Sequence, residues 1–465
     1  MKKLSKFFAI IISFVFFGVF SFISIPSKSV SATTNTEPTT AEFYNTVNSV
    51  LEKYVQFRDR IPGSQNEKDA SNFIVEFLNN NTECAPLNNS YVKDGVQSFR
   101  FESILDGQYY TSQNIIYTHK STSNSDKKII IGCSYDAIAF KFGTFQMEGE
   151  LVSSESVNGS AGSVALLLAL AKYLSIQSFD YDIEFIFFGA GESDNAGSTF
   201  YTQGISKDDA KNIALMINLD KVALGENTYF YVDEIENSFS KYFNNLSHEK
   251  KLGIKKVSTA NLGKVLNYRN KLGLDYTHIA LTSNNINFMS SNILSLNVFA
   301  GDYSDGITLG LCEYGDRDIL TYTDYDSIEY IIEVYGINEV TDNLYTAFNS
   351  INTLLNDSNF LINCLESANQ TSWIYKFFGN EKLMAYLTVA MIFIFIAVIL
   401  IINYNLTKKA YYSNIELEFV KTVMSITGNI DEHSVSTDVP EAVSEILVRD
   451  IKKDKRLKPN KKKKK

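Results

Sequence analysis

The chain has 465 residues, of which 45% are hydrophobic, and it carries a formal net charge of -10. This length is enough for one large globular domain or two smaller ones. An acidic chain lacks the basic face that a phosphate backbone requires, so we expect no nucleic-acid partner. The cysteines are too few to frame a domain of this size and have no CxxC spacing, so we expect free, partly buried thiols. They are Cys84, Cys133, Cys312 and Cys364.

The N-terminus has the pattern of an export signal. Lysines at positions 2, 3 and 6 precede a charge-free, mostly apolar run over residues 7–25, and small residues follow at 30–32. This predicts a signal peptide over 1–32, with an uncleaved anchor as the alternative because the run is long. In either case the following chain is exported. Residues 33–40 belong to a stretch rich in Ser and Thr, and we expect a linker there.

The predicted exported domain, residues 41–360, alternates between helical and strand patterns. Apolar residues at helical spacing predict helices over 43–57, 66–78, 164–174, 235–246 and 286–291, one or two helices over 327–355, and a further helix that begins at 198. Short runs of β-forming residues predict strands over 96–104, 113–117, 127–132, 183–188, 214–219, 229–232 and 294–299. The alternation predicts an α/β domain whose mixed central sheet is sandwiched by helices.

Carboxylates follow the buried strands in the middle of this domain. Glu192 comes shortly after the strand over 183–188, and Asp220 directly follows the strand over 214–219. Asp136 follows the strand over 127–132. In open α/β sheets, functional sites form beyond the carboxyl ends of the strands. We therefore expect the functional cleft at these strand ends.

The C-terminal part has the pattern of a membrane anchor. Residues 383–402 are apolar and uncharged for 20 positions, which is long enough to cross a bilayer. The juxtamembrane segment over 361–382 precedes this span, and the tail over 403–465 follows it. The tail is rich in lysine, which predicts that it lies in the cytoplasm. A buried core helix is the disfavoured alternative because of the length and the flanking charge. We expect a cell-membrane protein with one C-terminal spanning helix and an extracytoplasmic main domain.

Seven short motifs occur in order over about residues 54–355. They lie at 60–64, 129–136, 157–160, 191–198, 217–220, 283–295 and 326–329. They resemble, in the same order, the family patterns R-x-P-G-S, a strand ending in G-A-H-Y-D, D-N-x-S, E-E-x-G-x-x-G-S, N-L-D, S-D-H-x-x-F followed by G-I-P-x, and D-T-x-E. The family with these patterns is the zinc-dependent exopeptidases, which include bacterial co-catalytic aminopeptidases, glutamate carboxypeptidase II and glutaminyl cyclases. The resemblance implies the aminopeptidase-like fold.

The resemblance also implies two zinc ions, five protein ligands and a general-base Glu directly before the ligand Glu. Such ions lower the pKa of a bridging water and polarise the scissile carbonyl. In this chain the ligand Glu is kept as Glu192 and the second ligand Asp as Asp220. The other four positions depart from the family: Ser134 stands at the first His, Val157 at the bridging Asp, Gly191 at the base and Asn285 at the last His.

These departures predict that the family chemistry is lost. Valine cannot bridge two cations, and serine and asparagine are poor zinc ligands beside imidazole. We therefore expect no zinc cofactor, and we interpret Glu192 and Asp220 as remnants. One alternative is a single weak divalent cation held by these two carboxylates and Asp136.

Other residues give weaker signals. His278 would share a helical face with Asn285 and could replace it as a ligand, although a surface or capping role is favoured. His119 and His248 lie in polar surroundings and are interpreted as surface residues. Asn158 opens a glycine-bearing helix entry, where packing is favoured over anion binding.

Two functions remain open. The first is an exported pseudo-peptidase that binds a peptide or protein in its vestigial cleft or serves as a membrane-complex subunit, as family relatives such as nicastrin and the transferrin receptor do. The second is an active membrane-bound metallo-aminopeptidase with a rearranged metal site. The pseudo-peptidase function rests on analogy with relatives that share the fold.

Overall fold

The computed structural model describes residues 38–123, 125–141, 150–232, 237–257, 283–302, 320–336, 338–368 and 381–426. The chain divides into two compact units, Met1–Lys376 and Phe377–Lys465. The predicted signal peptide over 1–32, most of the predicted linker and the chain after residue 426 lie outside the described residues.

The first unit is built on one mixed sheet, which in the described residues has nine strands. These are β1 (Ala85–Pro86), β2 (Val96–Glu102), β3 (Tyr109–His119), β4 (Lys128–Ser134), β5 (Asp182–Phe188), β6 (Ile213–Leu219), β7 (Asn227–Tyr231), β8 (Lys255–Lys256) and β9 (Ser295–Gly301). The order is β1-β3-β5-β4-β6-β9-β7-β8, with β2 paired to β3. Strands β5, β4, β6 and β9 run parallel, and β3 and β7 are antiparallel to their neighbours in this central group. The prediction of a mixed central sheet is confirmed.

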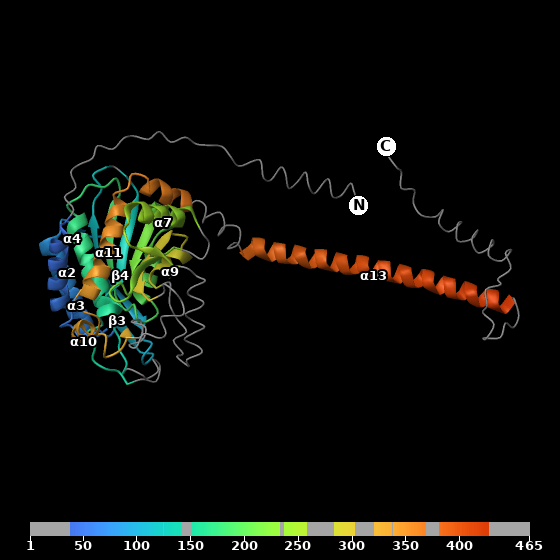
Figure 1. Ribbon diagram of the computed structural model, residues 1–465, viewed down its shortest axis with the longest axis horizontal. Helices are drawn as coiled ribbons and strands as arrows, with labels where there is room; N and C mark the ends of the chain where they lie inside the picture. Colours follow the sequence, from blue (N-terminus) through green and yellow to red (C-terminus); the bar gives the residue numbers. More distant parts are fainter. Residues whose placement is uncertain are drawn as a thin grey trace. The chain divides into compact units, whose positions relative to one another are not determined.

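Helices cover both faces of the sheet. They are α2 (Thr40–Tyr54), α3 (Gln65–Asn81), α4 (Gly162–Leu174), α5 (Ala196–Gly204), α6 (Lys207–Asn212), α7 (Ser238–Lys250), α9 (Asn285–Ser290), α10 (Ile328–Tyr335) and α11 (Asn338–Leu355). A π-helical turn, η1 (Val157–Ala161), leads into α4. Helices α2, α4 and α11 lie together on one side of β4 (Figure 1).

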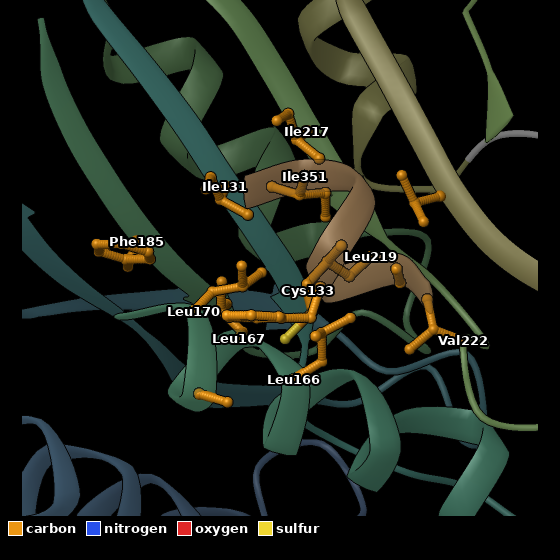
Figure 2. Packing of buried hydrophobic residues seen from close by; sticks show 14 of the residues in the cluster. Ile131, Cys133, Leu166, Leu167, Leu170, Phe185, Ile217, Leu219, Val222 and Ile351 are labelled. Carbon is orange, nitrogen blue, oxygen red and sulfur yellow. The ribbon is translucent and has the colours of Figure 1, made fainter. Parts of the chain in front are cut away.

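The side chains of β4 alternate between the two faces because successive residues of a strand point in opposite directions. Ile131 and Cys133 belong to the larger core, against the leucines of α4 (Figure 2). Ile130 faces the other way and belongs to a second cluster with Ile186 and Phe288. Every residue of α4 except Lys172 is buried, so this helix is the centre of the larger core.

The structure adds elements that the sequence pattern does not predict. Strands β1 and β8 have two residues each and carry no apolar alternation. Helix α6 buries no residue, so it lacks an apolar face, and it begins where the Ser206 side chain accepts a hydrogen bond from the Asp209 N–H. The three cysteines in the described part of the chain, Cys84, Cys133 and Cys364, are free and buried, as expected.

The second unit contains the long helix α13 (Glu381–Ile426). Two helices of the described chain are long and apolar enough to cross a membrane by length and composition. One covers Val157–Leu174 and is 89% buried, so it is the core helix that runs from η1 through α4. The other covers Ile392–Thr422 within α13, and none of its apolar window is buried.

Candidate functional site

The parallel strands bring the predicted site residues to one edge of the sheet. Ser134, the last residue of β4, is in register with Phe188 at the end of β5. Leu219, the last residue of β6, is in register with Val298 in β9. Since parallel strands all end at the same edge, the segments that follow β4, β5 and β6 meet there. These segments carry Asp136, Gly191 with Glu192, and Asp220 with Lys221.

Two buried carboxylates hold the turn after β5 in place. The oxygens of Asp136 accept hydrogen bonds from the N–H groups of Gly191, at 2.7 Å, and Glu192, at 2.9 Å. Glu67 accepts from the N–H groups of Ala190, at 3.1 Å, and Gly63, at 2.6 Å. Burial raises the pKa of Glu67 to about 8, and the charge of Asp136 contributes to the shift. Asp136 therefore stabilises the turn after β5, because both of its carboxylate oxygens accept hydrogen bonds from backbone N–H groups of that turn.

The raised pKa of Glu67 gives a testable pH dependence. Its folded-state pKa lies above the ordinary value, so between about pH 4.5 and 8 the folded chain binds more protons than the unfolded chain at this site. The free energy of unfolding should therefore fall as pH rises through this window, by at most about 1.4 kcal/mol per pH unit from this one group. We expect Glu67→Gln to remove that part of the slope, measured by urea unfolding of the purified chain between pH 5 and 8. The exposed Glu52→Gln is the control, and an equal slope in all three proteins would contradict the assignment.

Arg60, from the first family-like motif, is fully buried beside the same strand ends. Its guanidinium donates to the carbonyl oxygens of Tyr135, at 3.1 Å, Phe57, at 2.8 Å, and Glu155, at 3.0 Å. It also donates to the Ser160 hydroxyl at 3.0 Å and lies 4.8 Å from the centroid of the Tyr54 ring. Arg60 therefore joins the segment after β4 to η1.

A third buried carboxylate fixes the start of η1. Asp326 accepts from the N–H groups of Asn158, at 2.7 Å, and Gly159, at 2.9 Å. The Asn158 amide oxygen accepts from Leu224 N–H at 2.9 Å, and its NH₂ group donates to Thr321 at 2.8 Å. Val157 is fully buried in the larger core. The Asn158 side chain is thus hydrogen-bonded within the protein, and the side chain at 157 is enclosed by apolar groups.

Ser134, at the position of the family's first His, is packed directly against Gly191, at the position of the family's general base. A Cβ added at Gly191 would lie 2.7 Å from Ser134 Cβ and 3.1 Å from the Asp136 Oδ1 atom, and it would also meet Ser134 Oγ. Real Cβ atoms do not approach other carbons so closely. Ser134 and Gly191 are therefore a matched pair, and the backbone here leaves no room for a longer side chain at 191.

A network of amides lies beside Ser134. Asn284 donates to Ser134 Oγ at 2.9 Å, and Asn218 donates to Ser283 Oγ at 2.8 Å and to Asn297 at 2.7 Å. Asn285, at the last His position, is fully buried and accepts from the Ser283 N–H at 2.8 Å. Asn284, which the motif comparison did not single out, is thus the residue that faces Ser134.

The two remnant ligands are accompanied by a cation that the sequence analysis missed. Lys221 directly follows Asp220, and its ammonium lies 4.9 Å from the centroid of the Tyr322 ring. Burial raises the pKa of Glu192, as does the charge of Asp136, whereas Lys221 opposes the shift. Burial also raises the pKa of Asp220, and Lys221 again opposes it. Burial lowers the pKa of Lys221, but Tyr322, Asp220 and Glu192 outweigh it and hold that pKa above the ordinary value.

The residues at this edge do not fit the two-zinc site of the resemblance. Within the described ranges, no three His, Cys, Asp or Glu side chains are grouped so that they could hold a metal ion. Asp136 is engaged by backbone N–H groups, and a lysine, Lys221, directly follows the remnant ligand Asp220. His278 and Cys312 lie outside the described residues.

The two histidines within the described residues, His119 and His248, are away from these strand ends. His248 is exposed on α7, as expected. The interpretation of His119 as a surface residue is wrong. It is buried at the end of β3, where its Nε2 atom is 2.8 Å from the Gln177 carbonyl oxygen. The polar residues next to His119 in the sequence suggested an exposed side chain. Its partner, the Gln177 carbonyl group, lies far away in the chain and could not be foreseen from them.

Residues 114–271 match the model of peptidase family M28. This segment is M28-like. It includes β4, β5 and β6 with the strand ends described above, so the zinc aminopeptidase-like resemblance inferred from the motifs is confirmed. No curated protein matches the chain significantly.

Solved structures similar to the chain include zinc aminopeptidases and glutaminyl cyclases. The zinc aminopeptidase BSAP from Bacillus subtilis is 15% identical, with a TM-score of 0.45 over 68% of this chain and 93% of that protein. The glutaminyl cyclase of Porphyromonas gingivalis is 17% identical, with a TM-score of 0.43 over 66% of this chain and 95% of that protein. A leucine aminopeptidase precursor from Bacteroides thetaiotaomicron is 16% identical, with a TM-score of 0.43 over 68% and 97%.

Proposed function

We propose that the M28-like domain is a pseudo-peptidase that binds a peptide or protein at its strand-end cleft. In this proposal the domain lies outside the cytoplasm, and the C-terminal helix anchors it in the cell membrane, where it is also available for a membrane complex. The basic tail lies in the cytoplasm.

The observation that carries the proposal is the packing of Ser134 against Gly191. A general base must reach the proton that it abstracts, and glycine has no group that can do so. The space in which a side chain at 191 would begin is taken by Ser134 and Asp136. The loss of the base is thus accommodated by the surrounding residues.

The loops at these strand ends are nevertheless held in defined positions, which supports a binding role. The turn after β5 and the start of η1 are each held by buried carboxylates that accept two backbone N–H groups. These hydrogen bonds come from the protein alone, so they hold the two loops without a metal ion.

The membrane part of the proposal is supported by the apolar surface of α13. Large apolar side chains are exposed along it, among them Phe393, Phe395, Leu400 and Ile401. An apolar surface of this length needs a partner, and a bilayer supplies one. Lys408 and Lys409 follow the predicted span, in agreement with a cytoplasmic tail.

The proposed absence of peptidase activity is tested with the full chain purified in detergent. We expect less than stoichiometric zinc by elemental analysis and no chelator-sensitive release of nitroaniline from aminoacyl-anilides. The Bacillus subtilis zinc aminopeptidase serves as the positive control for the assay. Chelator-sensitive turnover that is lost in Glu192→Gln would establish the alternative of an active enzyme with a rearranged site.

Anchoring is tested by alkaline extraction of membranes. The full chain should stay in the membrane pellet, whereas a chain that ends at residue 380 should be extracted. A full chain that is extracted to the same extent as the truncated one would contradict the membrane anchor. The N-terminal apolar run is removed from both proteins so that it cannot retain either.

A further inference from the structure

We infer that the end of α13, residues 403–426, pairs with the same residues of a second copy of this chain as a parallel two-stranded coiled coil. The parallel orientation rests on the proposed membrane anchor, because two chains inserted with the same topology run in the same direction. The inference does not depend on whether the M28-like domain is catalytic.

Helix α13 does not stop at the end of the predicted span. It continues without a break to Ile426, which adds about 36 Å of helix at about 1.5 Å per residue (Figure 1). Every side chain that the structure describes between Asn403 and Thr422 is exposed. A helix in water owes most of its stability to an apolar face that packs against something else. This segment therefore needs a partner surface that the described residues do not supply.

One side of the segment has the heptad pattern of a two-stranded coiled coil. Uncharged residues recur at alternating spacings of three and four, which places them on one stripe at the heptad positions a and d. Asn403 is at an a position, where a single asparagine favours a parallel dimer and fixes its register. Leu406 and Val420, both at d, are 60% and 48% exposed. The whole stripe in the sequence is Asn403, Leu406, Ala410, Ser413, Leu417, Val420 and Met424.

The charges beside this stripe suit two identical helices. Glu416 is at the g position of one heptad, and Lys421 is at the e position of the next. In a parallel dimer, the g position of one helix faces the e position of the following heptad on the other helix, and opposite charges there select the partner. A symmetric dimer therefore contains two pairs of opposite charge, one on each side of the stripe.

The opposite face of the segment is less suited to pairing. It also exposes apolar side chains, Ile415 and Phe419. A heptad stripe through these two residues includes Lys408, whose ammonium lies 5.9 Å from the centroid of the Tyr404 ring of the same helix. Within the predicted span nearly every residue is apolar, so the residues that follow it decide which face pairs.

The pairing face is tested by cysteine crosslinking of the full-length chain in isolated membranes. Leu406→Cys, Ser413→Cys and Val420→Cys each place a thiol on the stripe. A disulfide spans about 4.4–6.8 Å between Cα atoms, which equivalent d positions of a parallel dimer satisfy. After mild oxidation, we expect on the order of tenfold more covalent dimer on a non-reducing gel than for the wild type, which reports any crosslinking through the native cysteines.

Tyr404→Cys, Tyr411→Cys and Ile415→Cys are the matched controls on the opposite face. Packed helix axes lie about 8–10 Å apart and Cα atoms about 2.3 Å from the axis, so Cα atoms on the two outer faces are more than about 12 Å apart. These variants should crosslink no more than the wild type. Covalent dimers at these positions, or at none of the stripe positions, would overturn the inference.

The charge pair is tested by reversing it. Glu416→Lys and Lys421→Glu each place like charges opposite one another, so the dimer dissociation constant should rise about three- to tenfold at low salt. The double variant Glu416→Lys/Lys421→Glu restores the attraction and should return to within about twofold of the wild type. Glu418→Lys is the matched control, because it makes the same charge change at a b position, away from the stripe. Sedimentation of the full chain in an uncharged detergent would measure each constant.

The sedimentation result can also overturn the inference. A monomer or a trimer would do so, as would a double variant no tighter than its single variants or a Glu418→Lys chain as weakened as Glu416→Lys. A different membrane protein on this face would appear as a crosslink to that protein in place of the dimer. Failure of the anchor would instead appear in the alkaline extraction, and zinc-dependent turnover would contradict the proposed function without affecting the dimer.

Discussion

Replacing Arg60 by methionine is expected to lower the free energy of unfolding by about 3–5 kcal/mol, the largest single-residue effect that we anticipate. The guanidinium is fully buried and donates to three carbonyl oxygens and one hydroxyl. Methionine fills similar space but donates nothing, so these buried acceptors lose their partner. Urea unfolding monitored by circular dichroism would measure the change.

Arg58 provides the matched control for this experiment. It lies two residues away and pairs with Glu155 at 2.6 Å, but its side chain is 54% exposed. Ion pairs at the surface contribute little, so Arg58→Met should cost less than about 1 kcal/mol. Equal losses in the two variants would show that the buried network does not stabilise the strand ends.

Gly191→Ala should cost about 1–3 kcal/mol, because the new methyl group overlaps Ser134 in a region that cannot expand freely. Gly191→Glu, which restores the family's base residue, should cost at least as much and yield no peptidase activity. Thermal and urea unfolding of each variant would measure the losses, and the aminoacyl-anilide assay would test activity.

Gly204→Ala is the control for Gly191→Ala. A Cβ at Gly204, the last residue of α5, would have no atom within 4 Å. We expect no loss there, or a gain of about 0.4–1 kcal/mol from the unfolded state. In the double variant Ser134→Gly/Gly191→Ala, part of the loss should be recovered, since the two positions are in contact. Strict additivity would contradict the matched-pair interpretation.

The sequence was sufficient for most of the central sheet. The strands β4, β5, β6 and β9 are short, mostly apolar runs that end in, or are directly followed by, polar or small residues, and such runs are recognisable without tertiary information. Helix α6 and strands β1 and β8 were missed because their residues bury no apolar face. Their positions depend on capping and on pairing with strands that only the fold brings near.

The site was predictable in position but not in its internal contacts. Family-like motifs located Ser134, Gly191, Glu192 and Asp220, because each motif sits at a strand end. Glu67 carried no such signal, since it accepts hydrogen bonds from the Ser112 hydroxyl and the Ala190 N–H, which lie far away in the chain. Lys221 had one signal that could have been used, its place directly after a remnant ligand, whereas its contact with Tyr322 depends entirely on packing.

The buried carboxylates at the strand ends have a consequence for how this chain can change. Asp136, Asp326 and Glu67 bind the loops through backbone N–H groups, which every residue except proline offers. These hydrogen bonds hold the loops through the backbone, whereas the close contacts at Gly159 and Gly191 restrict which side chains these two positions accept. Substitutions at the other loop positions that keep these hydrogen bonds therefore leave the scaffold in place, so a new binding specificity can arise there one substitution at a time.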